Sequence, residues 1–380
     1  MSMSQPEVFD VAVVGAGIAG ASVAYRLAPH RSVILLERES QPGYHSTGRS
    51  AAMFMESYGP PAVRALTRAS RSFYTRPPEG FAEHALLGAR GAMYLARPDQ
   101  QALMARQHAA LAATCQELEQ LDRDQTLALV PCLRPELVHG SLLDHGAMDI
   151  DVHSLHQGFL RGLRQHGGVL QPLAEVHKAG RGGGQWELQL SGGRAVRAKV
   201  VVNAAGAWAD QVAAQFGARS IGLVPHRRSA FTFKPPEGMQ VAHWPVVTSM
   251  DDNFYFKPEA GVLLGSPANA DPTVPHDVVP EELDVATGIH HIEVATTLVI
   301  RRPLRTWAGL RSFVPDGEMV IGWDAQCKNF LWLAGQGGYG IQSAPGASEL
   351  AASLVLGWPL PDELARHGVD SDALSPRRLH

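Results

Sequence analysis

The stretch that decides the fold reads Phe9-Asp10-Val11-Ala12-Val13-Val14-Gly15-Ala16-Gly17-Ile18-Ala19-Gly20. It places an apolar, buried strand directly before a tight turn at Gly15, and the missing side chain at Gly17 lets backbone N–H groups approach a pyrophosphate. Gly20 allows the following helix, which should begin near Ile18, to pack close to the strand. The N-terminus of that helix carries a partial positive charge and would face the phosphates. The stretch therefore predicts a dinucleotide-binding turn.

A second strand and an acid complete this pattern. Val33-Ile34-Leu35-Leu36 is apolar throughout and ends at Glu37, about 20 residues after the glycine turn. An acid at this place accepts hydrogen bonds from a ribose hydroxyl, which favours an unphosphorylated ribose. A glycine-rich turn alone is weak evidence, but strand, turn, helix, strand and acid occur here in order, and this context supports a dinucleotide cofactor.

Composition limits the class of protein. The 380 residues are 45% hydrophobic and carry a formal net charge of −4, so a large core is expected and neither nucleic acid nor an anionic membrane is an expected partner. No stretch approaches the roughly 20 apolar residues of a membrane span, and the N-terminus lacks a signal-peptide pattern. The cysteines, Cys115, Cys132 and Cys327, are widely separated and match no zinc motif. We expect a cytoplasmic protein with no metal site and no integral membrane segment.

The remaining chain alternates between two kinds of pattern. A loop rich in turn residues is expected at 40–50, helices at 62–74, 99–129 and 152–166, and a buried strand that ends at Asn203 and runs into 204–208. Residues 221–310 change to short strands, with one helix near 280–292. The end returns to α/β, with strands at 319–322 and 330–334, the glycine-rich loop 335–340 and an Ala-rich helix to about 356.

This order indicates an α/β fold whose two domains interleave. We expect a Rossmann-type FAD-binding domain at 1–85, 146–220 and 312–380. A smaller α+β substrate-binding domain, built on an antiparallel sheet, is expected at 86–145 and 221–311. No internal repeat or low-complexity linker separates the two.

Three glycine-containing elements lie far apart in the chain: the first turn, the strand end at 203–206 and the loop 335–340. A flavin uses this many, because one holds the adenosine and pyrophosphate and another helix N-terminus can stabilise negative charge on the reduced ring. The chain resembles the FAD-dependent amine and amino-acid oxidoreductases, which include D-amino-acid oxidase, glycine oxidase and sarcosine oxidase. It is most similar to the bacterial D-arginine dehydrogenases, at residues 43–52, 64–67, 227–231, 264–271, 306–313 and 336–342.

The resemblance implies a binding site for the substrate carboxylate. Arg228 and Arg311 would form a bidentate clamp, since a planar guanidinium matches a carboxylate. The sequence alone does not choose between Arg228 and its neighbour Arg227. The alternative for Arg228 and for Arg311 is a surface or ion-pair residue. Tyr58 and Tyr255 would contact the carboxylate or the amine, the alternative being simple packing. Strand alternation points Tyr255 away from the phenylalanines on both sides of it.

The resemblance also implies contacts with FAD. The expected cofactor-binding residues are Gly15, Gly17, Ile18, Ala19, Gly20, Glu37, Arg38, His45, Ser46, Thr47, Arg49, Ser50, Ala51, Ala205, Gly206, Trp208, Gly337, Gly338, Tyr339, Gly340 and Ile341. His45 and Arg49 would contact flavin or phosphate, with a loop histidine of no role as the alternative for His45. Cys327 does not match the cysteine to which sarcosine oxidases attach flavin, so binding should be non-covalent.

One departure from the resemblance concerns the substrate side chain. The arginine-specific dehydrogenases have a glutamate where this chain has Ala92, and a histidine and a threonine where it has Met53 and Met55. These three, with Gly338 and Gln342, are the expected substrate-binding residues, and methionines line adaptable apolar pockets. Glu56 would be either a replacement acid or a solvent-facing loop residue.

The implied reaction is the FAD-dependent oxidation of D-amino acids to 2-oxo acids and ammonia through an imino acid, with a neutral or broad side-chain preference. Alternatives are a D-arginine or D-lysine dehydrogenase, and a 2-hydroxy-acid or secondary-amine oxidoreductase of the glycine or sarcosine type. Two further alternatives are less favoured. The second glycine loop is not required in an NAD dehydrogenase, and the paired arginines are not required in a non-catalytic flavoprotein. The implied electron acceptor is a quinone or other carrier. The expected oligomeric state is a monomer or weak homo-oligomer.

Overall fold

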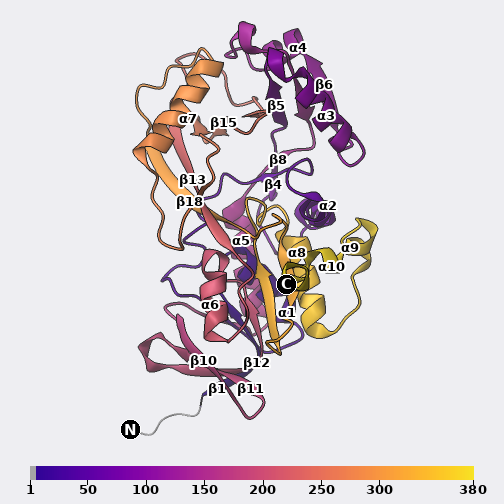
Figure 1. Ribbon diagram of the computed structural model, residues 1–380, viewed down its shortest axis with the longest axis vertical. Coiled ribbons are helices and arrows are strands. Elements are labelled where there is room, and N and C mark those ends of the chain that lie inside the picture. Colours follow the sequence, from indigo (N-terminus) through magenta and orange to yellow (C-terminus); the bar gives the residue numbers. More distant parts are fainter. Residues whose placement is uncertain (1–5) are drawn as a thin grey trace.

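The computed structural model describes residues 6–380 and shows two large sheets stacked along the longest axis of the molecule (Figure 1). An 8-stranded sheet occupies the lower part of the view, and a 9-stranded sheet occupies the upper part. A small 3-stranded sheet of β3 (Met53–Phe54), β8 (Met148–Ile150) and β4 (Leu87–Ala89) lies between them. The chain crosses between the large sheets several times, so each sheet collects segments that are remote in sequence.

The 8-stranded sheet is parallel at its centre. Its middle strand β1 (Glu7–Val14) pairs in parallel with β2 (Val33–Leu36) and with β12 (Ala195–Asn203). Further parallel pairs add β9 (Val169–Gln171) to β2 and β20 (Phe330–Ala334) to β12. The antiparallel edges are β10 (Val176–Gly182), β11 (Gln185–Leu190) and β19 (Val320–Trp323). The central strands are apolar on both faces, as a doubly covered parallel sheet requires.

Helices cover both faces of this sheet. On one face α1 (Ile18–Leu27) packs against α5 (Val152–Gln165) and α8 (Ala344–Leu356), and α8 also contacts α2 (Pro61–Thr75). On the other face α6 (Ala209–Gln215) lies over a second apolar core that includes Trp186, Phe330 and Trp332. Near the C-terminus follow the short helices α9 (Asp362–Arg366) and α10 (Ser371–Leu374).

The 9-stranded sheet runs β17-β13-β16-β15-β14-β5-β7-β6, and β18 pairs with the free side of β13. Its strands are β5 (Ala92–Ala96), β6 (Leu118–Asp122), β7 (Gly140–Asp144), β13 (Val224–Phe233), β14 (Val246–Ser249), β15 (Tyr255–Glu259), β16 (Val262–Ser266), β17 (Asp271–Pro272) and β18 (Arg305–Phe313). Three helices accompany it: α3 (Gln101–Ala112), α4 (Arg123–Leu129) and α7 (Glu282–Ala295). The pairs are antiparallel as expected, except β5 with β14, which are parallel.

The structure confirms the helices expected near 62–74, 152–166 and 280–292 as α2, α5 and α7. The prediction of helix through 99–129 is wrong, because β6 separates α3 from α4 there. Residues 118–122 pair with the edge of β7, so a tertiary contact overrides the helical spacing. Asp122 then caps α4, since its side chain accepts a hydrogen bond from the Gln125 N–H. Strands of the two large sheets fall within the chain segments expected for the two domains, except that β18 extends past the expected boundary at 311 to Phe313. The domain boundaries stay a prediction.

The glycine turn is a point of very close backbone packing. Gly15 has φ of +99°, and a Cβ built on Gly20 would lie 1.8 Å from the Gly15 carbonyl oxygen. This contact sets the distance between α1 and β1, as the spacing of the glycines predicts.

We expect Gly20→Ala to destabilise the protein by about 3 kcal/mol or more, because backbone must move to admit the methyl group. This cost exceeds the roughly 1 kcal/mol that alanine gains over glycine inside a helix. Thermal unfolding followed by circular dichroism measures the effect. Gly180→Ala in β10 is the matched control, since no atom lies within 4 Å of the added Cβ, and equal melting temperatures for the two variants would contradict the argument.

Candidate active site

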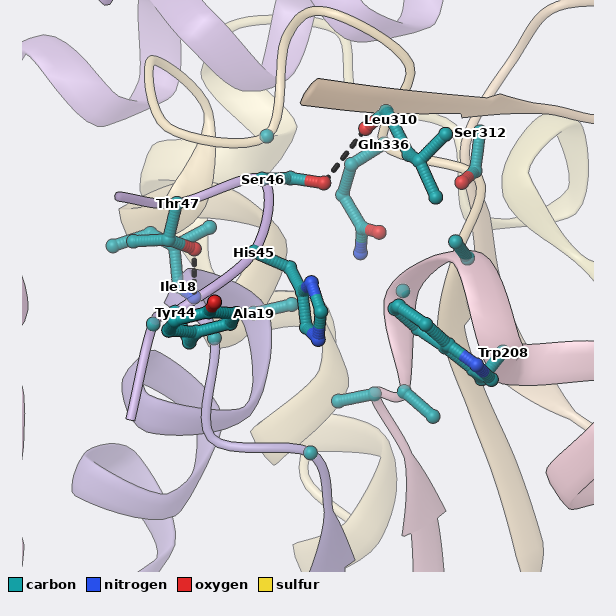
Figure 2. A pocket seen from close by; sticks show the side chains of 18 of the residues that line it. Ile18, Ala19, Tyr44, His45, Ser46, Thr47, Trp208, Leu310, Ser312 and Gln336 are labelled. Atoms are coloured by element: carbon teal, nitrogen blue, oxygen red, sulfur yellow. Dashed lines mark hydrogen bonds between the residues drawn. The ribbon is translucent and has the colours of Figure 1, made fainter. Parts of the chain in front are cut away.

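The principal cavity opens at the carboxyl ends of β1, β2 and β12 and has a volume of about 360 Å³. Its walls come from the turn at 14–19, the loop 43–51, the segment 204–208 and the loop 336–341, with β13, β15 and β18 at one end. Figure 2 shows the N-terminus of α1, the loop residues Tyr44 to Thr47 and Trp208 around this space. We call it the dinucleotide cavity.

Nearly all of the expected cofactor-binding residues line the dinucleotide cavity. Gly20 and Tyr339 do not, because Gly20 packs on Gly15 and the Tyr339 ring packs edge-on against Tyr58. The motifs did not indicate Glu175, Val176 and His177, which also line the cavity. Glu175 directly precedes β10, and Val176 and His177 are the first residues of that strand. This stretch contains no glycine and no recognisable spacing.

The turn is braced by Glu37 and Thr47. Glu37 accepts hydrogen bonds from the Ala16 N–H (2.8 Å) and the Glu39 N–H (2.9 Å), which ties β2 to the turn. Thr47 Oγ1 accepts a hydrogen bond from the Ile18 N–H (3.0 Å) in the first turn of α1 (Figure 2). No acidic side chain lies in that first turn, so the positive end of the helix dipole remains available to an anion.

A buried histidine on α5, which the motifs did not indicate, contacts the same turn. His156 on α5 has its Nε2 2.9 Å from the Ala16 carbonyl oxygen, and a Cβ on Gly43 would lie 3.0 Å from its Cε1. Burial lowers the pKa of His156, so the ring is neutral near pH 7 and donates its N–H to Ala16. His156 therefore locks α5 to the turn and to the start of the loop 43–51.

The loop 43–51 is fixed mainly by contacts with β18. Ser46 Oγ donates to the Leu310 carbonyl (2.7 Å; Figure 2), and Trp307 Nε1 donates to the Arg49 carbonyl (2.9 Å). The Arg49 guanidinium donates to the carbonyls of Val278 and Ala308 and forms an ion pair with Asp277. Although Arg49 lines the cavity, its terminal nitrogens are engaged by protein. Its expected contact with flavin or phosphate stays a prediction.

His45 and Trp208 form an aromatic wall. The centroids of the His45 and Trp208 rings are 4.6 Å apart (Figure 2). The His45 Nε2 is 3.1 Å from Glu39 Oε1. The Arg38 guanidinium lies over the Trp208 ring at 5.1 Å. All three line the dinucleotide cavity.

The pairing of β13 with β18 separates the two neighbouring arginines. Arg228 lies opposite Gly309, and Arg311 lies opposite His226, so Arg228 and Arg311 are diagonal neighbours on one face, within reach of long side chains. Both line the cavity. Arg227 is on the opposite face, where it forms ion pairs with Asp284 (2.8 Å), Asp271 (3.4 Å) and Glu281.

Arg228 and Arg311 carry two positive charges, and among the described residues Asp252 offsets them only in part. Burial and the Arg311 charge lower the pKa of Arg228, and its Nε is buried without a hydrogen-bond partner among the described residues. The nearest acid to Arg228 is Asp252, with Oδ2 3.9 Å from Nη2. Arg311 donates from Nη1 to the Tyr58 hydroxyl (3.1 Å). An anion that accepts two or more hydrogen bonds, such as a carboxylate, fits this pair.

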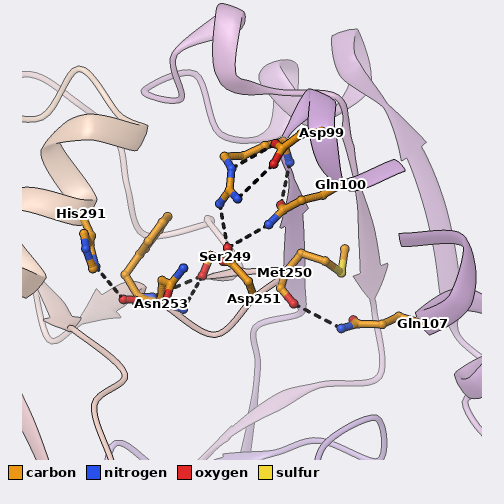
Figure 3. Close-up of polar contacts among 10 residues, drawn as sticks. Asp99, Gln100, Gln107, Ser249, Met250, Asp251, Asn253 and His291 are labelled. Carbon is orange, nitrogen blue, oxygen red and sulfur yellow. Dashed lines mark hydrogen bonds and ion pairs between the residues drawn. The ribbon is translucent and has the colours of Figure 1, made fainter. Parts of the chain in front are cut away.

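The turn between β14 and β15 holds Tyr255 and Asp252 beside the arginines. Asp251 accepts hydrogen bonds from Arg97 Nη1 (2.8 Å) and Gln100 Nε2 (2.9 Å), while His291 Nδ1 on α7 lies 2.9 Å from the Asn253 carbonyl (Figure 3). The turn is thus anchored from both sides. Burial raises the pKa of Asp252. Tyr255 lines the cavity, while both neighbouring phenylalanines are buried in the core.

The expected substrate-binding residues divide into two groups. Met55 and Ala92 form a buried group with Ala147 and Val246, and Met53, Tyr58, Tyr94 and Tyr255 pack against it; we call this set the apolar cluster. Gly338 lines the dinucleotide cavity, whereas Gln342 is buried behind Tyr58, donating from Nε2 to the Tyr58 carbonyl (3.2 Å) and to Thr67 Oγ1 (3.0 Å). Gln342 therefore supports Tyr58 rather than facing the cavity.

Glu56 fulfils neither of the expected roles, because it forms an ion pair with Arg71 (2.7 Å) and its side chain is 16% exposed. None of the three cysteines lines the cavity, and Cys327 is buried in the core around β20. Within residues 6–380, no cluster of His, Cys, Asp and Glu is suited to hold a metal ion. No described helix is long and apolar enough to cross a membrane.

We expect alanine substitutions of the two adjacent arginines to affect the free energy of unfolding to different extents. Arg227→Ala should lower the free energy of unfolding by about 3 kcal/mol, because it leaves partly buried carboxylates without their cation. Arg228→Ala should cost less than about 1 kcal/mol or be stabilising, since it removes a buried charge that faces a like charge. Urea unfolding without added ligand compares them, and equal losses would show that Arg228 is a structural residue.

Comparisons with known proteins agree with this geometry. Residues 10–354 match the family model described as FAD dependent oxidoreductase. Dimethylglycine dehydrogenase from Rattus norvegicus is 26% identical over 93% of this chain, which spans only 44% of that relative's length. Glycine oxidase from Bacillus licheniformis is 22% identical, and the match covers 93% of this chain and 95% of the relative.

Solved structures share the fold over nearly the whole chain. Glycine oxidase from Geobacillus kaustophilus has a TM-score of 0.82 at 22% identity, covering 96% of this chain and 99% of that one. L-Proline dehydrogenase from P. horikoshii has a TM-score of 0.84 at 20% identity, covering 98% of both. These matches confirm the expected fold class, and the family match confirms FAD as the cofactor. The glycine turn, the available N-terminus of α1 and the cavity that they line fit FAD, and the chain belongs to the FAD dependent oxidoreductase family.

Proposed function

We propose that the protein oxidises neutral D-amino acids to 2-oxo acids and ammonia. The observation that supports this most directly is the pair Arg228 and Arg311, two partly buried guanidinium groups on one face of the β13–β18 pair that line the dinucleotide cavity. A substrate carboxylate placed there would satisfy the unpaired Arg228 Nε and offset the repulsion between the two cations.

The reaction removes two electrons and two protons from the substrate. The α-carbon loses a hydride and the neutral amine loses a proton, which gives an imino acid that water hydrolyses to the 2-oxo acid and ammonia. Bound non-covalently, FAD supplies the electron acceptor. Arg228 and Arg311 hold the carboxylate, and Tyr58, itself bonded to Arg311, and Tyr255 flank it. Fixing the substrate in this way supplies the orientation that such a transfer needs.

The apolar cluster supports the preference for neutral side chains. Ala92 is 0% exposed and Met55 9% exposed, and neither bears a charge to receive a guanidinium. Burying a cation there costs several kcal/mol, whereas an apolar side chain gains about 25 cal/mol per Å². The matching proteins named glycine oxidase and dimethylglycine dehydrogenase favour a second candidate, a secondary-amine or glycine-type oxidoreductase.

We expect Arg311→Ala and Arg228→Ala each to reduce the rate of flavin reduction by about 30-fold or more, equal to a loss of roughly 2–5 kcal/mol. Lysine should rescue poorly, because it lacks the planar fork. Stopped-flow absorbance under anaerobic conditions measures the rates, and acid extraction should release equal amounts of FAD from all variants. Arg302→Ala, at an exposed position, is the control. If both alanine variants reduce flavin at the wild-type rate, the carboxylate binds elsewhere.

A substrate panel separates the candidate functions. We expect kcat/KM for D-leucine or D-methionine to exceed that for D-arginine, glycine, sarcosine and all L-isomers. Ala92→Glu should raise the D-arginine to D-leucine ratio, because it introduces the missing carboxylate. D-Arginine tenfold better than every neutral D-amino acid, a difference of about 1.4 kcal/mol, would overturn the proposed preference. Sarcosine or glycine as the best substrate would establish the second candidate.

A further inference from the structure

A carboxylate lies on the same sheet face as the apolar cluster. β5 runs between β7 and β14, and Ala92 is paired with Asp144 on one side and Val246 on the other. Residues directly opposite one another share a face, as do residues two apart along a strand. Asp144, Ala92 and Tyr94 therefore point to the same side, toward the segment that carries Met53, Met55 and Tyr58.

A string of hydrogen bonds connects Asp144 to the apolar cluster. Asp144 is 2% exposed, and its Oδ1 accepts the Gly146 N–H (3.0 Å). Its Oδ2 accepts the Ser57 hydroxyl (2.6 Å), and Ser57 Oγ is 2.8 Å from the Tyr94 hydroxyl. Ser57 immediately precedes Tyr58, so the string also fixes the backbone that places Tyr58 beside Arg311.

The carboxylate sets the direction of every proton in this string. Ser57 Oγ donates to Asp144 Oδ2, and because a serine hydroxyl has a single proton, Ser57 must accept from the Tyr94 hydroxyl. The phenol proton of Tyr94 is then committed to Ser57. Tyr94 can therefore only accept a hydrogen bond from a further partner. Of the three side chains in the string, Tyr94 is the one that packs against the apolar cluster, and it remains partly exposed.

We propose that Tyr94, oriented by Ser57 and Asp144, is a specificity-determining acceptor beside the apolar cluster and selects uncharged side chains that carry a hydrogen-bond donor. This rests on the proposed function, because it takes the carboxylate to lie at Arg228 and Arg311 and the side chain at the apolar cluster. Charged side chains are disfavoured, since a phenol oxygen offsets little of the cost of burying a cation. Arg71 is paired with Glu56 and does not enter the string.

Two substrate pairs of matched size test the proposal with the holoenzyme. D-Tyrosine is compared with 4-fluoro-D-phenylalanine, and D-threonine with D-valine, by kcat/KM. In at least one pair the donor-bearing member should be favoured about three- to tenfold, the worth of one neutral hydrogen bond. Tyr94→Phe should bring that ratio to about one. Ser57→Ala should also lower it, because the phenol regains a proton to donate.

Ser141→Ala is the matched control. Ser141 is a buried hydroxyl on β7, the strand of Asp144, but bonds to Thr126 Oγ1 (2.9 Å) on the far side of the strand pair from Ser57, and its substitution should leave the selectivity ratio unchanged. Melting temperatures and FAD content are recorded for all variants. A wild-type ratio of one in both pairs, or a ratio that Tyr94→Phe does not change, would overturn the proposal.

A binding measurement separates this inference from the proposed reaction. Isothermal titration calorimetry compares 3-(4-hydroxyphenyl)propanoate with 3-(4-fluorophenyl)propanoate, which share the carboxylate and need no turnover. Tighter binding of the hydroxy acid, lost in Tyr94→Phe, supports the role of Tyr94 even when no D-amino acid is oxidised. In that case only the proposed reaction fails. Oxidation of D-amino acids with equal binding of the two acids retains the reaction and overturns the role of Tyr94.

Discussion

The pairing of β18 with β13 is the constraint on which the site depends. The register in which β18 pairs with β13 puts Arg228 and Arg311 on a shared face of the two strands. Its carbonyls also accept three hydrogen bonds from two remote segments: Leu310 from Ser46 and Ala308 from Arg49, both in the loop 43–51, and Ser312 from the Gly337 N–H. The loop 43–51, the second glycine loop and the arginine pair are therefore positioned relative to one strand. A shift of that strand by one residue would turn Arg311 away from the cavity and break all three anchors.

The same strand pair shows how the molecule treats buried charge. On one face Arg227 is surrounded by Asp284, Asp271 and Glu281, which makes it a structural ion-pair centre. On the other face Arg228 has a buried nitrogen without a partner and a second guanidinium as its neighbour. Stability alone does not favour the second arrangement. A binding role for an anion accounts for it, and strained or unsatisfied groups gather at functional sites for this reason.

Much of the dinucleotide-binding part could be predicted from the sequence, because its requirements are local. Gly15, Gly17 and Gly20 act within six residues, and Glu37 follows from a fixed spacing. Contacts set by sheet pairing could not be predicted in this way. Neither the choice between Arg227 and Arg228 nor the strand inside 99–129 is determined by neighbouring residues. His156 was missed because a lone histidine on an amphipathic helix has no distinguishing spacing, and only the fold places it under Ala16.

The interleaving of the chain also has a consequence for biosynthesis. The parallel sheet takes its central strands from residues 7–14, 33–36 and 195–203, and β20 joins it only at residues 330–334. A growing chain on the ribosome therefore exposes the C-terminal end of β12 as an open sheet edge until residues 330–334 have been made. Pairings of such large sequence separation form slowly, and open parallel edges invite association with other chains. Folding of the parallel sheet should thus be late and cooperative, with the cofactor pocket closed only after β20 has emerged.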